Sequence, residues 1–315
     1  MQKQNPNNSD LTLLLEHYQN ARYADAYKLA ISITKDCPFH SFAWQILGAL
    51  HEASGNIAEA LLAKKTVVRL NPNEPEAHYS LGITLMEAGD EVSALEEFAQ
   101  VILIRPTLEA KHFFVSALKN THPTLWDEQL AGMVISALLE PWGKPQDIEV
   151  FACQLLKLEP DFQNLLFEFE GEGNKYAEWF NSLKKNPPYL PLLSALMVSG
   201  PISDPRLEKY FTSLRLNFLE SVNSTPHYQM SREEEIFYCA LAEQCFVNEY
   251  VYYQTPEEID LSIVMRNRLI QVIDDREVAS PTLMIAVACY FPLHTLKHSD
   301  RLLTQNHSKH LMSVL

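Results

Sequence analysis

One sequence pattern occurs twice between Ser41 and Pro106, and the second copy follows the first after 34 residues. Small residues and prolines keep this interval in four pairs: Gly48 and Gly82, Gly55 and Gly89, Ala60 and Ala94, Pro72 and Pro106. Ala26 and Pro38 carry two of these marks one interval earlier. Because glycine readily ends a helix and proline cannot continue one, each copy is predicted to hold two helices.

The order of the marks resembles the tetratricopeptide repeat, a 34-residue pair of helices with the pattern W-x2-L-G, then Ala, then Pro. Trp44 to Gly48 matches the first part, and His78 to Gly82 matches it with histidine in place of tryptophan. The resemblance implies a solenoid of stacked helix pairs. We expect three repeats and a degenerate fourth helix pair over residues 11–140, with helices at 11–19, 23–34, 41–54, 57–70, 76–88, 91–104, 108–119 and 125–139.

The remaining segments are also predicted to be helical or irregular, because none shows the two-residue alternation of a half-buried strand. Residues 1–10 are polar and expected to be disordered. Residues 141–188 are expected to hold a connecting helix at 146–157 and an irregular linker. A C-terminal helical domain is expected over 189–315, with helices at 191–197, 204–221, 231–253, 256–274, 281–291 and 299–314. The predicted fold class is therefore all-α.

The charge balance excludes two classes of partner. The chain of 315 residues has 40 acidic and 25 basic side chains, a formal net charge of −15, and no run of basic residues. Binding to nucleic acid or to an anionic membrane rests on clustered Lys and Arg, so neither partner is expected. The first ten residues hold no apolar segment, and the five cysteines are scattered. We therefore expect no signal peptide, reduced core cysteines and a cytoplasmic location.

Five segments after the repeats resemble one family in the order in which they occur. They are Pro141–Pro145 (PWGKP), Pro191–Leu196 (PLLSAL), Asp204–Glu208 (DPRLE), Phe237–Val251 (FYCALAEQCFVNEYV) and Tyr290–His294 (YFPLH). This order is similar to the N-terminal region of bacterial proteins in which tetratricopeptide repeats precede a class I S-adenosylmethionine-dependent methyltransferase domain. The resemblance implies a helical region that accompanies a methyltransferase. In such proteins the catalytic domain follows the region that this sequence matches, so this chain is expected to be either a short relative or a fragment without that domain.

The cofactor loop of such a methyltransferase would read acidic-x-G-x-G-x-G after a strand. The nearest segment here, Glu170 to Asn174, has two glycines, lacks the third, and follows no predicted strand. No glycine occurs after Gly200, although a phosphate- or cofactor-cradling loop needs glycines for close backbone approach. We therefore expect no cofactor and no catalysis by this chain alone.

The concave face of the repeats is the first candidate site, because the first helix of each pair lines it and meets a ligand. A protein segment, either a peptide or a helix, is the expected partner there, and the alternative is that the C-terminal region of the chain fills the groove. By register the face includes Leu15, Tyr18, Gln45, Ala49, Glu52, Tyr79, Ile83, Met86, Phe113 and Ala117.

The second candidate is the segment Asn248-Glu249-Tyr250, which interrupts an apolar stretch of the helix predicted at 231–253. Polar side chains in such a helix must be exposed or hydrogen-bonded. They form either a buried network that fixes helix packing or a contact with a catalytic domain or substrate. Two other functions stay open: an enzyme with an unrecognised site in the C-terminal domain, and a self-associating structural protein.

Four histidines near the end of the chain have spacings that can place pairs on one helical face: His294 with His298, and His307 with His310. Zinc sites use such pairs. Histidines at helix ends are also common as solvated or capping residues, and we predict no metal site.

Overall fold

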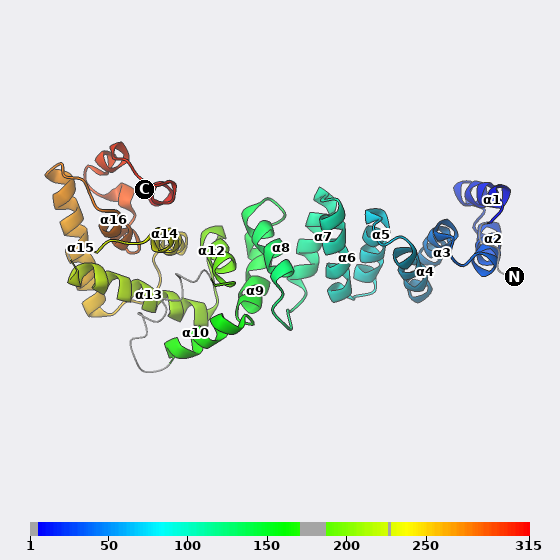
Figure 1. Cartoon of the computed structure of the whole chain (residues 1–315), viewed down its shortest axis with the longest axis horizontal. Coiled ribbons are helices and arrows are strands. Elements are labelled where there is room, and N and C mark those ends of the chain that lie inside the picture. Colours follow the sequence, from blue (N-terminus) through cyan, green and yellow to red (C-terminus); the bar gives the residue numbers. More distant parts are fainter. Residues whose placement is uncertain (1–5, 171–186, 226–227) are drawn as a thin grey trace. The chain divides into compact units, whose positions relative to one another are not determined.

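The computed structural model describes residues 6–170, 187–225 and 228–315, and the chain divides into two compact units, Met1–Thr121 and His122–Leu315. All regular elements in these described ranges are helices, which confirms the all-α fold class (Figure 1). The division falls inside the predicted fourth helix pair, so its two helices belong to different units. The glycines of the segment Glu170–Asn174 and residues 181–186 of the predicted linker lie outside the described residues.

In the described part of the first unit, three helix pairs and a further helix, α7, stack in chain order (Figure 1). Each helix packs on the next one along the chain, with the closest packing inside the pairs α3–α4 and α5–α6. The bounds agree with the 34-residue register to within a few residues. The helices are α1 (Asn8–Gln19), α2 (Tyr23–Asp36), α3 (Ser41–Ala53), α4 (Ile57–Leu70), α5 (Pro75–Glu87), α6 (Glu91–Ile104) and α7 (Leu108–Lys119).

A side chain near the start of α3 and of α5 ties each repeat to the proline that ends the preceding one. The indole Nε1 of Trp44 donates to the carbonyl of Pro38 over 2.9 Å, and Nε2 of His78 lies 2.8 Å from the carbonyl of Pro72. Both pairs are six residues apart, and the second follows the first after 34 residues. Tryptophan and histidine therefore serve the same role in consecutive repeats.

The turns that follow α1, α3 and α5 have the same geometry, although only two of them contain glycine. Gly55 and Gly89 have φ of 73° and 75°, and Ala21 takes φ of 57° at the equivalent place. In each turn the next residue donates its N–H to the helix five residues back, as in Arg22 to His17 over 2.8 Å. A side chain in this left-handed conformation costs about 1–2 kcal/mol, because its Cβ approaches the following carbonyl.

We therefore expect Ala21→Gly to stabilise the protein by about 0.5–1 kcal/mol, since part of the relief is offset by the greater freedom of glycine in the unfolded chain. Urea unfolding followed by circular dichroism measures the change. Gly55→Ala is the matched reverse substitution, because a Cβ there would have nothing within 4 Å and would change only the backbone energy. Loss of stability in Ala21→Gly would contradict this explanation of the turn.

The C-terminal helices of the second unit pack around α16 (Pro281–Ala288), whose residues from Thr282 onward are all buried. A helix that is apolar on every side has to be enclosed, and here α13, α14, α15 and α17 contact it. The other elements are α8 (Glu128–Leu139), α9 (Pro145–Leu156), α10 (Pro160–Glu170), α12 (Leu190–Ser199), α13 (Pro205–Ser224), α14 (Arg232–Val247), α15 (Pro256–Asp274), α17 (Lys309–Val314) and the 3-10 helices η1 (Leu293–Thr295) and η2 (Ser299–Thr304).

A buried ion pair joins α13 to α15 beside this core. The guanidinium of Arg215, which is 0% exposed, donates from Nε to Glu258 Oε1 over 3.0 Å and from Nη2 to the carbonyl of Tyr253 over 2.8 Å. The hydroxyl of Tyr290 donates to the same carboxylate over 2.6 Å, and its ring centroid lies 4.7 Å from the guanidinium carbon. Glu258 also caps α15 through the N–H of Thr255. One carboxylate thus holds three elements together.

Several expected bounds are wrong, and each error has a local cause. The helix predicted at 231–253 ends at Val247, where the chain turns. Residues 160–170, predicted to be irregular, form α10, which begins at a proline as helices often do. The helix predicted at 299–314 is divided into η2 and α17. At the N-terminus, Asn7 caps α1 by accepting the N–H of Ser9, so residues 8–10 are helical rather than disordered.

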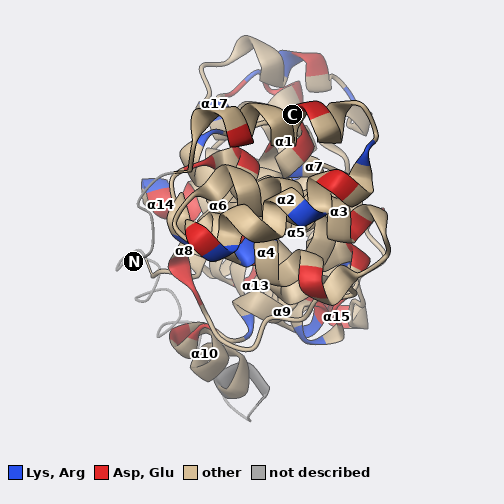
Figure 2. Cartoon of the chain, turned by 90° about the vertical axis from the view of Figure 1, so that its right-hand side faces the viewer, with Lys and Arg blue, Asp and Glu red and all other residues tan. Residues whose placement is uncertain are grey.

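The five cysteines are buried free thiols. Burial, reinforced by the nearby charges of Glu235 and Glu243, raises the pKa of the Cys239 thiol to about 12. Within the described ranges, no helix is both long and apolar enough to cross a bilayer. Acidic side chains are spread over the helices and are more numerous than basic ones (Figure 2).

Candidate functional site

A groove of about 290 Å³ opens between α3, α4 and α5 of the first unit. Three of its residues, Gln45, Ala49 and Glu52, are ones that the repeat register places on the concave face. They occupy successive turns of α3, because residues three or four apart share one side of a helix. The opposite wall and floor are formed by Lys64, Val67, Glu74, Glu76, Ala77 and Ser80.

A lysine that the sequence analysis did not single out forms the polar centre of this groove. Lys64 is 6% exposed, and its ammonium lies 2.6 Å from Glu52 Oε1 and 2.5 Å from Thr84 Oγ1. It also donates to the carbonyl of Ser80 over 3.3 Å, so all three of its donors are used. Thr84 in turn donates to Glu52 Oε1 over 2.7 Å. The network connects α4 to both neighbouring first helices and holds the Glu52 carboxylate in one position.

Lys64 lies 34 residues before Phe98 and therefore takes the place of a core aromatic residue. In the third repeat Phe98 packs over Gly82, and a Cβ on that glycine would be 2.8 Å from the ring. In the second repeat the stem of Lys64 passes over Gly48, where a Cβ would be 3.1 Å from its Cγ. The space over the glycine accommodates either side chain, and the lysine places its ammonium group in the groove. Nothing in the sequence distinguishes this lysine from a solvated one on an amphipathic helix.

Two of the predicted groove residues are brought together by aromatic packing. Tyr79 and Phe113 lie edge to face with ring centroids 5.9 Å apart, and Phe98 stacks on Phe113 at 5.3 Å. Tyr79 and Phe113 are both half-buried, whereas Phe98 is fully buried. This cluster connects α5, α6 and α7, so it stabilises the stacking of repeats and also presents aromatic surface.

The other predicted concave residues have different surroundings. Tyr18 is half-buried and packs against the core of the first two helix pairs. Ile83 and Met86 are half-buried on α5, Leu15 is exposed, and Ala117 is buried. Of the predicted concave residues, Gln45, Ala49 and Glu52 of α3 line the groove, whereas its α5 side is formed by residues that were not predicted.

The expected position of Asn248, Glu249 and Tyr250 is corrected, because these residues follow α14 instead of lying inside it; their contact with a catalytic domain or substrate stays a prediction. Asn248 is the C-cap, and Glu249 and Tyr250 take φ of 52° and 57°. The N–H of Tyr250 donates to the carbonyl of Cys245 over 2.9 Å, which is the hydrogen bond of a Schellman motif. Glu249 is exposed, and burial raises the pKa of the half-buried Tyr250. The position of these three residues at a helix end therefore accounts for their polar side chains.

The buried polar network in this region is formed by Gln244, one turn earlier on α14. With its amide oriented to suit its neighbours, its nitrogen donates to the carbonyls of Met197 (2.9 Å) and Gly200 (3.0 Å). Its oxygen accepts from the N–H of Ile202 and the hydroxyl of Tyr252, both at 3.2 Å. Every hydrogen-bonding position of the amide is thus used between α14 and the segment after α12, which indicates a structural role.

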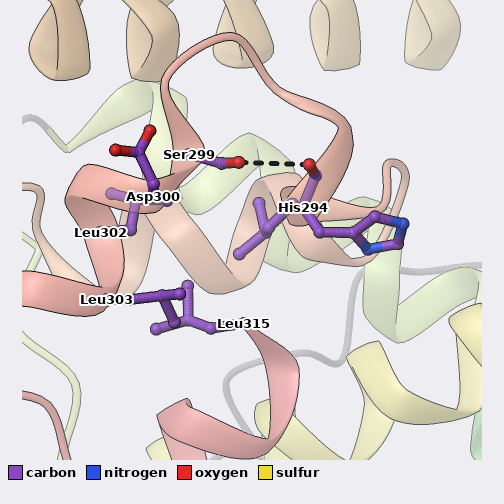
Figure 3. Close-up of a pocket in the computed structure, with 7 residues that line it drawn as sticks. His294, Ser299, Asp300, Leu302, Leu303 and Leu315 are labelled. Carbon is purple, nitrogen blue, oxygen red and sulfur yellow. Dashed lines mark hydrogen bonds between the residues drawn. The ribbon is translucent and has the colours of Figure 1, made fainter.

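A second pocket, of about 190 Å³, lies in the second unit near the end of the chain (Figure 3). Leucine side chains from η1, η2 and the C-terminal residue line most of it, namely Leu293, Leu302, Leu303 and Leu315. Ser299 Oγ donates to the carbonyl of His294 over 3.1 Å, and Figure 3 shows the His294 imidazole pointing away from these leucines. The pocket offers an apolar surface with few polar groups directed into it.

A third pocket, of about 320 Å³, lies between α2 and α3 and is lined by Tyr23, Tyr27 and His51 among others. The rings of Tyr27 and His51 meet edge to face at 5.4 Å. None of the three pockets described is lined by Asn248, Glu249 or Tyr250.

The four C-terminal histidines have separate environments. His307 Nε2 lies 2.7 Å from the carbonyl of Leu302, and His298 Nε2 lies 3.9 Å from Asp274. Across residues 6–170, 187–225 and 228–315, no three His, Cys, Asp or Glu side chains are grouped so that they could hold a metal ion.

The lysine network gives the stability of the first unit a pH dependence. Burial by itself would raise the pKa of Glu52, but the hydrogen bonds from Lys64 and Thr84, together with the charge of Lys64, outweigh it and lower that pKa. A carboxylate with a lowered folded-state pKa contributes stability above its unfolded pKa of about 4.3, and loses it as pH falls through the folded value.

We expect Glu52→Gln to unfold at lower urea concentration than the unsubstituted protein at pH 7, and the difference to shrink as the pH is lowered below about 4. Glu59→Gln is the control, because Glu59 is exposed on α4 outside the groove. A difference that stays constant down to pH 3 would show that the Glu52 charge is not what Lys64 stabilises.

Comparisons with known proteins assign this chain to no family. No family model matches the chain, and no curated protein matches it. Among the solved structures that match is a mutant O-GlcNAc transferase from Thermobaculum terrenum, with 23% identity over 42% of this chain and a TM-score of 0.33. Another is the Naa15/Naa10 complex bound to HypK-THB, with 14% identity over 97% of this chain and a TM-score of 0.27.

The chain spans 26% of the length of the first of these solved chains and 57% of the second. At such low TM-scores the likeness carries no argument about activity or partner. The assignment of a helical-repeat fold to the first unit therefore rests on its own 34-residue register, helix pairing and turns.

Proposed function

We propose that the chain is a protein-interaction module whose first unit binds a peptide segment of a partner protein in the groove at Gln45, Ala49 and Glu52. The observation that carries the proposal is the construction of the groove, in which the buried Lys64 holds a carboxylate in place. Binding sites favour polar groups that are held in position before the ligand arrives, because less entropy is then lost on binding. The partly exposed rings of Tyr79 and Phe113 supply further contact surface.

A random peptide library displayed on phage and selected on the full chain tests this function. Peptides recovered from the selection are expected to lose at least tenfold in affinity, measured by fluorescence anisotropy, for an Ala49→Arg variant, because the larger side chain fills the groove. Ala53→Arg is the matched control on the same helix, since Ala53 is exposed and does not line the groove. Failure to recover any peptide, or equal binding by the two variants, would refute the peptide groove.

We further propose that this module is the recognition or scaffold region of a methyltransferase system, and that catalysis belongs to a separate domain. The support is the similarity of Phe237–Val251 and the four other segments to the region that precedes a class I methyltransferase domain. Calorimetric titration of the chain with S-adenosylmethionine is expected to give no binding heat. Binding with micromolar affinity would overturn the proposal that this chain lacks the cofactor site.

A further inference from the structure

The groove of the proposed function is lined by more acidic than basic side chains. Three carboxylates line it, Glu52, Glu74 and Glu76, against one cation, Lys64. All three donors of Lys64 are taken up by Glu52, Thr84 and Ser80, so this ammonium has none left for an anionic ligand. The charge that remains open to a ligand is therefore negative.

The position of Glu52 leaves one of its oxygens available. Both of the contacts described for its carboxylate, from Lys64 and from Thr84, go to Oε1. Among the residues that the structure describes, none donates a hydrogen bond to Oε2, and about 30% of the side chain is exposed. A carboxylate fixed through one oxygen and open at the other is suited to accept a hydrogen bond from a charged donor, which is stronger than one from a neutral donor.

Glu76 provides a second acceptor that is readily released. It pairs with Arg105, but the two side chains are 59% and 58% exposed, and such surface pairs contribute little. Tyr79 follows Glu76 by three residues, which places both side chains on the same face of α5. An aromatic ring beside carboxylates favours a cation, because the ring face carries partial negative charge.

We propose that the groove selects peptide segments with a lysine or arginine side chain, which donates to Glu52 Oε2 and Glu76 and lies near Tyr79. This proposal rests on the proposed peptide-binding function and specifies its ligand. Complementary charge sets specificity by favouring basic segments over acidic ones, which the three carboxylates of the groove would repel.

The composition of the library peptides selected on the full chain tests the proposal. Lysine and arginine are expected to be enriched, and aspartate and glutamate depleted, relative to the unselected library. Replacing the enriched cation by glutamine in a synthetic copy of the best peptide is expected to weaken binding at least tenfold. This second measurement leaves the protein unchanged, so it does not depend on the folding of a variant.

A matched pair of double variants shows whether the groove is responsible. Glu52→Gln with Glu76→Gln is expected to weaken binding at least tenfold. Glu59→Gln with Glu87→Gln removes the same charge from exposed positions of α4 and α5 outside the groove, and is expected to change binding less than twofold. Equal losses in the two variants would mean that general acidity attracts the peptides, and would overturn the proposal.

The outcomes also separate this proposal from the function on which it rests. Recovered peptides without basic enrichment would overturn the cationic ligand and leave the peptide groove in place. A selection that recovers no peptide would refute both.

Discussion

Arg215→Ala is expected to lower the free energy of unfolding by about 3–5 kcal/mol, the largest loss expected of a single substitution proposed for this protein. The substitution removes the cation from Glu258, whose side chain is 3% exposed, and leaves that charge without a partner in the core. It also removes the donor to the Tyr253 carbonyl and the cation over the Tyr290 ring. Urea unfolding followed by far-ultraviolet circular dichroism measures the loss.

A double variant separates the cost of the unpaired charge from the loss of packing. Arg215→Met with Glu258→Gln keeps the volume and removes both charges, and the single glutamine oxygen can still accept from Tyr290 or from Thr255, which donate to different oxygens of Glu258. Because replacement of a buried ion pair by uncharged groups is often close to neutral, the double variant is expected to be more stable than Arg215→Ala. A double variant as unstable as the single one would show that packing, not charge, dominates at this site.

Gly82→Ala is expected to destabilise the repeat unit by about 1–3 kcal/mol, although alanine is the better helix former. The added Cβ would lie 2.8 Å from Phe98 Cε1 and 2.9 Å from its Cζ. The ring cannot move aside freely, because it is fully buried and stacks on Phe113 at 5.3 Å. Thermal or urea unfolding of the variant measures the effect.

Gly132 provides the contrasting substitution, since it lies in α8, is exposed, and would have nothing within 4 Å of an added Cβ. Gly132→Ala is expected to stabilise by about 0.5–1 kcal/mol through helix propensity alone. In the double variant Gly82→Ala with Phe98→Leu, the smaller side chain at position 98 is expected to recover part of the stability that Gly82→Ala loses. Stabilisation by Gly82→Ala would contradict the close approach of α5 and α6.

The repeat register is predictable from the sequence because glycine and proline act locally. The repeat pattern predicts Gly55 and Gly89 at the ends of first helices, and both have positive φ there. The end of α14 carries no such signal, since a non-glycine residue, Glu249, takes the left-handed turn and apolar residues continue to Tyr253. The turn is identified only in the structure, by the hydrogen bond from the N–H of Tyr250 to the carbonyl of Cys245.

The candidate groove was predictable in part. Gln45 and Glu52 follow from helical spacing, and so does the pairing of Tyr79 with Phe113 across neighbouring repeats. Lys64 was not predictable, because a lysine on an amphipathic helix is ordinarily solvated and its burial depends on Thr84, which lies in the next repeat. Gln244 was missed for the same reason, since three of its four partners, Met197, Gly200 and Ile202, lie far from it in sequence.

Lys64 and Phe98 occupy equivalent positions in consecutive repeats. Because one is a lysine and the other a phenylalanine, the contacts between neighbouring first helices differ from one repeat to the next. At Lys64 the contact between neighbouring first helices is polar, and at Phe98 the next such contact is aromatic. Identical contacts in every repeat would let an extended ligand slide by one repeat at no cost in energy. The two unlike contacts remove that equivalence, so a bound segment is expected to have a single register along the helices.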